Sequence, residues 1–261
     1  IFNLLICLSA YLLICLSACQ KHPSNLDGLS PHYYSDNAVG SGDTENCCIV
    51  IAHAGGGIDG NSYSNSVEAV TRNYELGTRL FELDFELTSD GSWVGTHDWP
   101  NWSRQTGFKG KLPPSYAQFK KQKIRFKTSG WSVPGQYSPI TFEWLLDFLS
   151  KHQDAYIVVD TKADLQAIAR HIVLGAPDQF ILQAYSLDDV DFLLGLDGNS
   201  KIILTLYKLG RRNIDLGAIT AQIDQLVGIT MPVTWAAESE LLSQIMKLGL
   251  PVYLHGRPGS I

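Results

Sequence analysis

Short apolar runs recur along the chain between residue 47 and residue 255, and they alternate with longer segments of mixed character. Each short run is rich in β-branched and other apolar residues, which is typical of a strand buried in a parallel sheet. The pattern predicts eight strands, at residues 48–52, 80–88, 93–96, 155–159, 180–185, 201–207, 228–231 and 251–255.

The longer segments have apolar positions at helical spacing. They predict helices at residues 66–76, 141–151, 164–174, 187–196, 216–226 and 238–248. Gly77 is a natural residue to follow the first helix, and Thr141 is a plausible N-cap of the second. Repeated alternation of strand and helix implies an α/β protein with a parallel sheet, and eight strands favour a closed (β/α)8 TIM-type barrel over an open doubly wound sheet. We therefore expect a barrel over residues 47–261.

The N-terminal residues 1–18 are almost wholly apolar and carry no charge. Such a segment fits the apolar region of a signal peptide or a short membrane span. It ends in Leu16-Ser17-Ala18-Cys19, which resembles the lipobox of bacterial lipoproteins. The resemblance implies cleavage before Cys19, a lipid on its thiol, and export to the periplasm or cell surface as a membrane-anchored lipoprotein. The alternative is an uncleaved N-terminal anchor helix.

Residues 19–46 are rich in Ser, Asn, Asp and Gly and have no apolar period, so we expect a flexible tether. The formal charge of the whole chain is −6, which argues against a general nucleic-acid-binding protein. The five cysteines have no spacing typical of a zinc site.

An insertion at residues 99–142 differs from the rest of the chain because it contains no Asp or Glu. One interpretation is a solvated, Lys-rich excursion. The other places it over the barrel mouth, where it would attract an anionic substrate or phospholipid headgroups. Its basic residues are Arg104, Lys109, Lys111, Lys120, Lys121, Lys123, Arg125 and Lys127.

Candidate catalytic residues follow the predicted strands. His53 follows the first strand directly, and Glu82 and Asp84 lie two positions apart on the second. Side chains two apart on a strand share one face, so both carboxylates can meet one hard cation such as Mg2+ or Ca2+. The alternative is a pair of satisfied carboxylates at the solvated end of the strand.

Further chemical groups follow later strands. His97 comes after the third predicted strand, while Asp160 and Lys162 come after the fourth. In a barrel of this type, catalytic groups gather at the carboxyl ends of the strands. Two imidazoles can divide the proton transfers, a divalent cation can neutralise a phosphate oxygen, and a lysine can add a second positive charge. Together they fit a phosphodiester better than an ester or an amide.

Six segments, in this order and spacing, resemble those of the glycerophosphodiester phosphodiesterases, and the barrel topology extends the resemblance over residues 47–255. The segments read Ile51-Ala52-His53-Ala54-Gly55-Gly56, Asn65-Ser66-Val67-Glu68-Ala69, Phe81-Glu82-Leu83-Asp84-Phe85, Thr88-Ser89-Asp90-Gly91, Thr96-His97-Asp98 and Tyr156-Ile157-Val158-Val159-Asp160-Thr161-Lys162.

The resemblance implies a phospholipase C-like phosphodiesterase barrel that hydrolyses glycerophosphodiesters or related small-molecule phosphodiesters. It implies that His53 and His97 are the general acid and base and that Lys162 contacts the phosphate. A divalent metal ion, Mg2+ or Ca2+, would be held by Glu82, Asp84 and Asp160. Family members typically let a neighbouring hydroxyl of the substrate attack phosphorus and then open the cyclic phosphate with water.

The chain departs from the family pattern at several positions. Ala54 stands where the family has Arg, Ser64 where it has Glu, and Asp160 where it usually has a longer Glu. The related toxin-type sphingomyelin phosphodiesterases have Asp before x-Lys, so a lyase-type, phospholipase D-like reaction that forms a cyclic phosphate stays open. The family's last helix is not expected after His255.

A second class of function is a catalytically weak surface lipoprotein that binds a phosphate-bearing ligand. Ala54 and Ser64 favour it. Retention of His53 and His97 favours the enzyme, because a pure binding protein needs no pair of proton-transfer groups.

Overall fold

The computed structural model describes residues 12–16 and 50–255, except for residues 60, 62, 126, 129–130, 133–136, 176–177 and 237–238. The predicted tether and the predicted lipidation site Cys19 lie outside these residues, and so does the chain after His255. None of the helices in the described part combines the length and the apolar character needed to cross a membrane.

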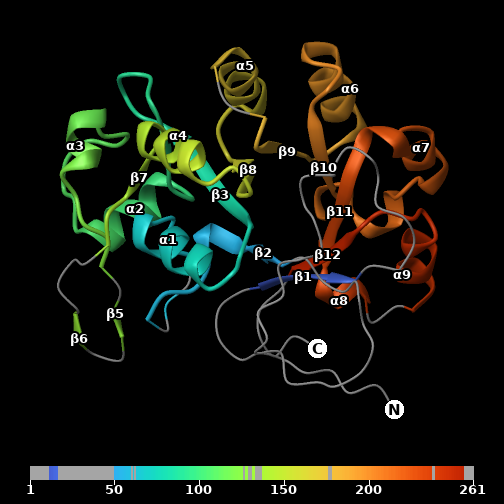
Figure 1. The fold of residues 1–261 in the computed structure, drawn as a ribbon, viewed down its shortest axis with the longest axis horizontal. Coiled ribbons are helices and arrows are strands. Elements are labelled where there is room, and N and C mark those ends of the chain that lie inside the picture. Colours follow the sequence, from blue (N-terminus) through green and yellow to red (C-terminus); the bar gives the residue numbers. More distant parts are fainter. Residues whose placement is uncertain are drawn as a thin grey trace.

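Seven of the eight predicted strands lie parallel to one another and form most of a barrel (Figure 1). Each pairs in parallel with the next, and the antiparallel strand β1 (Leu12–Leu16) pairs with both the last and the first of them. The seven strands are β2 (Ile51–Ala52), β3 (Leu80–Leu87), β8 (Tyr156–Thr161), β9 (Phe180–Ala184), β10 (Lys201–Thr205), β11 (Leu226–Pro232) and β12 (Val252–His255).

The prediction that residues 93–96 form a barrel strand is wrong. Strand β4 (Trp93–Gly95) pairs antiparallel with the end of β3 and with β7 (Ile140–Thr141), outside the ring of parallel strands. The physical reason is the short turn between β3 and β4, since a parallel neighbour needs a crossover of a dozen or more residues. The eighth place in the ring belongs to β1 instead.

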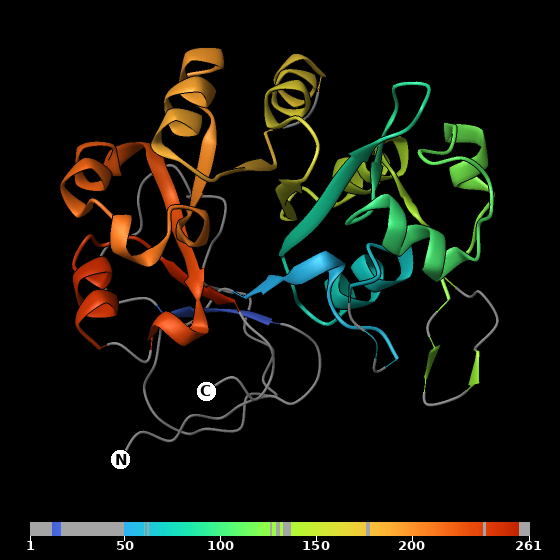
Figure 2. The same ribbon diagram turned by 180° about the vertical axis from the view of Figure 1, so that it is seen from behind.

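Helices cover the outside of the strands (Figures 1 and 2). Several begin at a side chain that accepts a hydrogen bond from the backbone of the first turn, including Ser66 and the predicted N-cap Thr141. The helices of the barrel are α1 (Val67–Glu75), α4 (Phe142–Lys151), α5 (Leu165–Gly175), α6 (Leu187–Leu196), α7 (Leu216–Ala221), α8 (Val233–Ala236) and α9 (Ser239–Met246).

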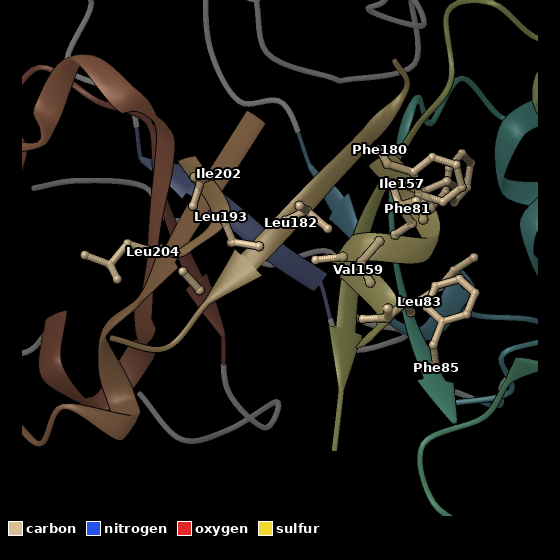
Figure 3. Packing of buried hydrophobic residues seen from close by; sticks show 14 of the residues in the cluster. Phe81, Leu83, Phe85, Ile157, Val159, Phe180, Leu182, Leu193, Ile202 and Leu204 are labelled. Atoms are coloured by element: carbon tan, nitrogen blue, oxygen red, sulfur yellow. The ribbon is translucent and has the colours of Figure 1, made fainter. Parts of the chain in front are cut away.

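The strands bury both faces. On the outer face, residues such as Phe81, Leu83 and Val159 pack under the helices, as Figure 3 shows for β3, β8, β9 and β10. Alternation along each strand sends the intervening residues inward. One residue from each parallel strand forms the inner apolar cluster, namely Ile51, Leu80, Val158, Ile181, Ile203, Val227 and Tyr253. The polar side chains two positions further along β3 and β8, Glu82 and Asp160, therefore lie next to this apolar cluster inside the barrel.

The insertion has a small core of its own, built from α2 (Trp99–Thr106) and α3 (Tyr116–Lys120). The rings of Trp102 and Phe119 stack with centroids 5.4 Å apart. A hairpin of β5 (Lys127–Thr128) and β6 (Trp131–Ser132) leads back to β7. Seven of its basic residues are exposed, namely Arg104, Lys109, Lys111, Lys120, Lys121, Lys123 and Arg125.

Candidate active site

A tight turn after β2 carries His53. The 3₁₀ turn η2 (His53–Gly55) has Ala54 at φ 50°, and Gly56 follows at φ 90°. A Cβ at Gly56 would lie 2.6 Å from Nδ2 of Asn73, so this position requires glycine. The Asn73 amide donates to the carbonyl oxygens of residues 55 and 57 and holds the turn against α1. The two glycines of His-Ala-Gly-Gly are thus required by the local conformation, since Gly55 also has a positive φ of 82°.

A backbone N–H of the same turn contacts a carboxylate on β3. The N–H of Ala54 donates to Oε2 of Glu82 at 2.8 Å. The imidazole Nε2 of His53 lies 3.6 Å from the same oxygen. Burial lowers the pKa of His53, the positive charges of His97 and Lys162 lower it further, and the charge of Asp84 partly offsets this. His53 is therefore a neutral imidazole near pH 7.

Three buried carboxylates meet at the carboxyl ends of β3 and β8. Asp84 and Asp160 are direct partners in the register of the two strands, and Glu82 lies two residues before Asp84 on the same face. Oxygen atoms of all three lie within 4.8 Å of one another. Within the part of the chain that the structure describes, this acidic triad is the group of three that could hold a metal ion.

The triad is electrostatically strained without a cation. Burial, followed by the charges of Asp84 and Asp160, raises the pKa of Glu82 well above its usual range. Burial and the charge of Asp84 raise the pKa of Asp160 to about 7. One buried oxygen of Glu82, Oε1, has no hydrogen-bond partner. A hard divalent cation would neutralise this charge and take that oxygen as a ligand, so the residues fit such an ion.

His97 lies at the end of β4, between an acid and a lysine. Its Nδ1 is 2.6 Å from Oδ2 of Asp98, and the other oxygen of Asp98 accepts from the backbone of Asn101 and caps α2. The ammonium of Lys162, on the loop after β8, lies 3.0 Å from Nδ1 of His97. The antiparallel hairpin that is not part of the barrel thus delivers His97 to the same end as the triad.

The structure therefore brings together all six residues expected at the site. His53, Glu82, Asp84, His97, Asp160 and Lys162 interact electrostatically as one group. The expected roles of His53 and His97 remain predictions.

Sequence reasoning missed two tyrosines at this end of the barrel, Tyr185 and Tyr207. The Tyr185 hydroxyl donates to Oδ1 of Asp160 and accepts from Nε2 of Gln183 at 3.2 Å. The ring of Tyr207 lies 5.5 Å from that of His255. A signal was available, because Tyr185 and Tyr207 directly follow β9 and β10, as His53 follows β2. The apolar pattern instead includes both tyrosines in the predicted strands 180–185 and 201–207.

Neither a protein-family model nor a curated protein sequence matches this chain. Solved structures do match. A glycerophosphoryl diester phosphodiesterase from Parabacteroides distasonis is 16% identical, with a TM-score of 0.63 over 91% of this chain and 78% of that chain. A glycerophosphodiester phosphodiesterase from Thermotoga maritima is 19% identical, with a TM-score of 0.55 over 79% of this chain and 84% of that chain.

A third match is a phosphodiesterase from Oleispira antarctica in complex with the product sn-glycerol-3-phosphate. It is 15% identical, with a TM-score of 0.57 over 77% of this chain and 81% of that chain. At these identities the likeness establishes a shared fold. The fold implied by the resemblance of the short motifs is therefore confirmed.

Proposed function

We propose that this chain, which has the fold of the glycerophosphodiester phosphodiesterases, hydrolyses glycerophosphodiesters or related phosphodiesters with the help of a divalent metal ion. The observation that supports this most is a triad of buried, mutually repelling carboxylates close to two histidines and one lysine. A pure binding protein could use the acids to hold a metal but needs no pair of proton-transfer groups beside them, whereas phosphoryl transfer uses both the cation and the two imidazoles.

The chain's own residues divide the work. Lys162 binds a non-bridging oxygen of the phosphodiester as a point charge. His53, a neutral imidazole near pH 7, accepts the proton of the attacking hydroxyl. His97, oriented by Asp98, donates a proton to the leaving oxygen. A bound divalent cation, held by Glu82, Asp84 and Asp160, would supply charge neutralisation for the phosphate oxygens.

The donor set consists of carboxylate oxygens alone, which favours Mg2+ or Ca2+ over softer metals. A lyase-type outcome is the second candidate. Asp160 is shorter than the usual Glu and accepts a hydrogen bond from Tyr185, so the metal-binding residues differ here from those of the family. In that case the cyclic phosphate would be the final product.

The test is an assay of the full chain with glycerophosphocholine and with a chromogenic phosphodiester, in Mg2+ or Ca2+. We expect turnover that stops with EDTA and with His53→Ala or His97→Ala, but continues with His171→Ala, an exposed histidine on α5. Phosphorus NMR of the products separates hydrolysis from ring formation. Metal binding without turnover of any diester would contradict the enzyme and favour the phosphate-binding lipoprotein.

We also propose export as a lipoprotein anchored through Cys19, on the strength of Leu16-Ser17-Ala18-Cys19. Cleavage before Cys19 would remove β1 from the ring of strands, so the processed chain and the ring with β1 exclude each other. Mass spectrometry of the mature N-terminus, with Cys19→Ser as the control, separates them. An intact leader on the mature protein would contradict the proposal.

A further inference from the structure

A second cation approaches the acidic triad from a different strand. Lys208 ends the 3₁₀ turn η3 (Leu206–Lys208), which follows β10 directly. Its charge and that of Lys162 both lower the pKa of Asp160, so both lysines lie near this carboxylate. Lys162 comes from the end of β8 and contacts His97. Lys208 contacts neither histidine in the part of the chain that the structure describes.

Lys208 is positioned by an aromatic ring. Its ammonium lies 3.6 Å from the ring centroid of Tyr185. The hydroxyl at the far end of this ring donates to Asp160. The ammonium therefore stands over the face of the ring and the acidic triad lies at its hydroxyl end. The side chain of Tyr185 therefore lies between Lys208 and the triad. A ligand whose phosphate binds at the triad can place a neighbouring group at Lys208.

Aromatic side chains continue the surface beside Lys208. The ring of Tyr207 is 6.0 Å from that of Tyr185 and is 41% exposed. Burial raises the pKa of Tyr207, and the charges of Asp160, Asp84 and Glu82 raise it further, which agrees with a place beside the triad. The Tyr207 hydroxyl can donate a hydrogen bond to a ligand, whereas the single proton of the Tyr185 hydroxyl is already donated to Asp160. The ring of His255 lies next to that of Tyr207, with the two ring centroids 5.5 Å apart.

The charge at this surface decides which ligand it prefers. No carboxylate lies within ion-pair distance of Lys208 among the residues described, so its charge is available to a ligand. A quaternary ammonium is disfavoured, because an ammonium already occupies the face of Tyr185 on which such a group would stack. An anionic group would gain a charge-assisted hydrogen bond from Lys208.

We propose that Lys208, Tyr185 and Tyr207 form a subsite for the alcohol portion of the phosphodiester, and that the subsite selects alcohols carrying a second anionic group, a phosphate or a carboxylate. This inference rests on the proposed function, since it assumes that the reacting phosphate binds at the triad. It deepens that function by naming the substrate class.

The affinities of two diesters test the subsite independently of the reacting centre. Bis(glycerophospho)glycerol carries a second phosphate diester on its alcohol, whereas glycerophosphoglycerol carries a neutral glycerol. Their dissociation constants would be measured by calorimetry on the full chain with His97→Asn and Ca2+, so that turnover does not interfere. We expect the first to bind about tenfold more tightly, as one charged hydrogen bond allows, well beyond the about twofold advantage of its two equivalent ends.

Lys208→Met should abolish this preference. The matched control is Lys247→Met, an exposed lysine just after α9, which should keep it. Equal affinities of the two diesters, no binding of either, or a preference that survives Lys208→Met would each overturn the subsite. Turnover by the unmodified chain is measured separately. If the anionic diester binds more tightly and neither is cleaved, the subsite stands and the proposed function fails.

Discussion

Asn65 and Asp84 hold each other through two reciprocal hydrogen bonds. The side-chain amide of Asn65 donates to Oδ2 of Asp84 at 2.9 Å, and its carbonyl oxygen accepts from the backbone N–H of Asp84 at 3.1 Å. Both residues are buried, and Asn65 adopts a left-handed φ of 44°. The loop before α1 therefore fixes one carboxylate of the triad in a single orientation.

Removing this pair of hydrogen bonds should weaken metal binding. We expect Asn65→Ala to lower the affinity for Mg2+ or Ca2+ about 10- to 100-fold, as is usual when a partner of a metal-binding carboxylate is lost. Calorimetric titration with metal measures this. The matched control is Asn199→Ala in an exposed turn, which should leave the affinity unchanged. An unaltered metal affinity in Asn65→Ala would show that Asp84 keeps its orientation without the hydrogen bonds from Asn65.

The triad should make the metal-free protein more stable in mild acid. The pKa of Asp160 is about 7 in the folded protein and about 3.9 in an unfolded chain. As the pH falls through 7, the folded state takes up a proton that the unfolded state does not, so stability rises until the pH nears 4. In EDTA we expect a higher Tm at about pH 5.5 than at about pH 8.

Asp160→Asn is the control for this pH dependence, because it removes one of the two triad carboxyl groups with a raised pKa and should make the profile shallower. Added metal should act in the opposite direction. It competes with protons for the same oxygens, so metal affinity should fall as the pH falls below 7. A metal-free Tm that falls steadily from pH 8 to pH 5.5 would contradict the raised pKa.

The turn that carries His53 should tolerate no side chain at Gly56. In Gly56→Ala the new Cβ would collide with Asn73, and φ would be strained, at a cost of about 1–3 kcal/mol or more in the free energy of unfolding. Gly77→Ala is the matched control, since φ is 101° there but nothing lies within 4 Å of the new Cβ. Urea unfolding should show a larger loss for Gly56. Equal losses would mean that Asn73 moves aside freely.

The basic insertion should steer anionic substrates. Lys120, Lys121 and Lys123 are exposed, and we expect that changing all three to Gln raises KM for an anionic diester at low ionic strength. The difference should shrink at physiological ionic strength, where the screening length is about 8 Å. Changing three exposed basic residues outside the insertion, Lys151, Arg170 and Lys247, to Gln controls for the loss of three positive charges. An unchanged KM at low salt would exclude steering.

Much of the candidate site could be predicted because its signals are local. Alternation along a strand places Glu82 and Asp84 on one face, and the position directly after a strand marks His53. These follow from backbone geometry over a few residues. The same reasoning failed at residues 93–96, because a single strand looks alike whether its neighbour is parallel or antiparallel. Only the length of the turn distinguished the two.

The sequence by itself therefore determined the class of fold and the six reacting and metal-binding candidates. The tertiary structure decided how they meet. The register of β3 against β8 sets Asp84 opposite Asp160, and burial together with the charge of Asp84 raises the pKa of Asp160. It also gathers Tyr185 and Lys208 beside them. Pairing between distant strands depends on packing of the whole barrel, which no local pattern encodes.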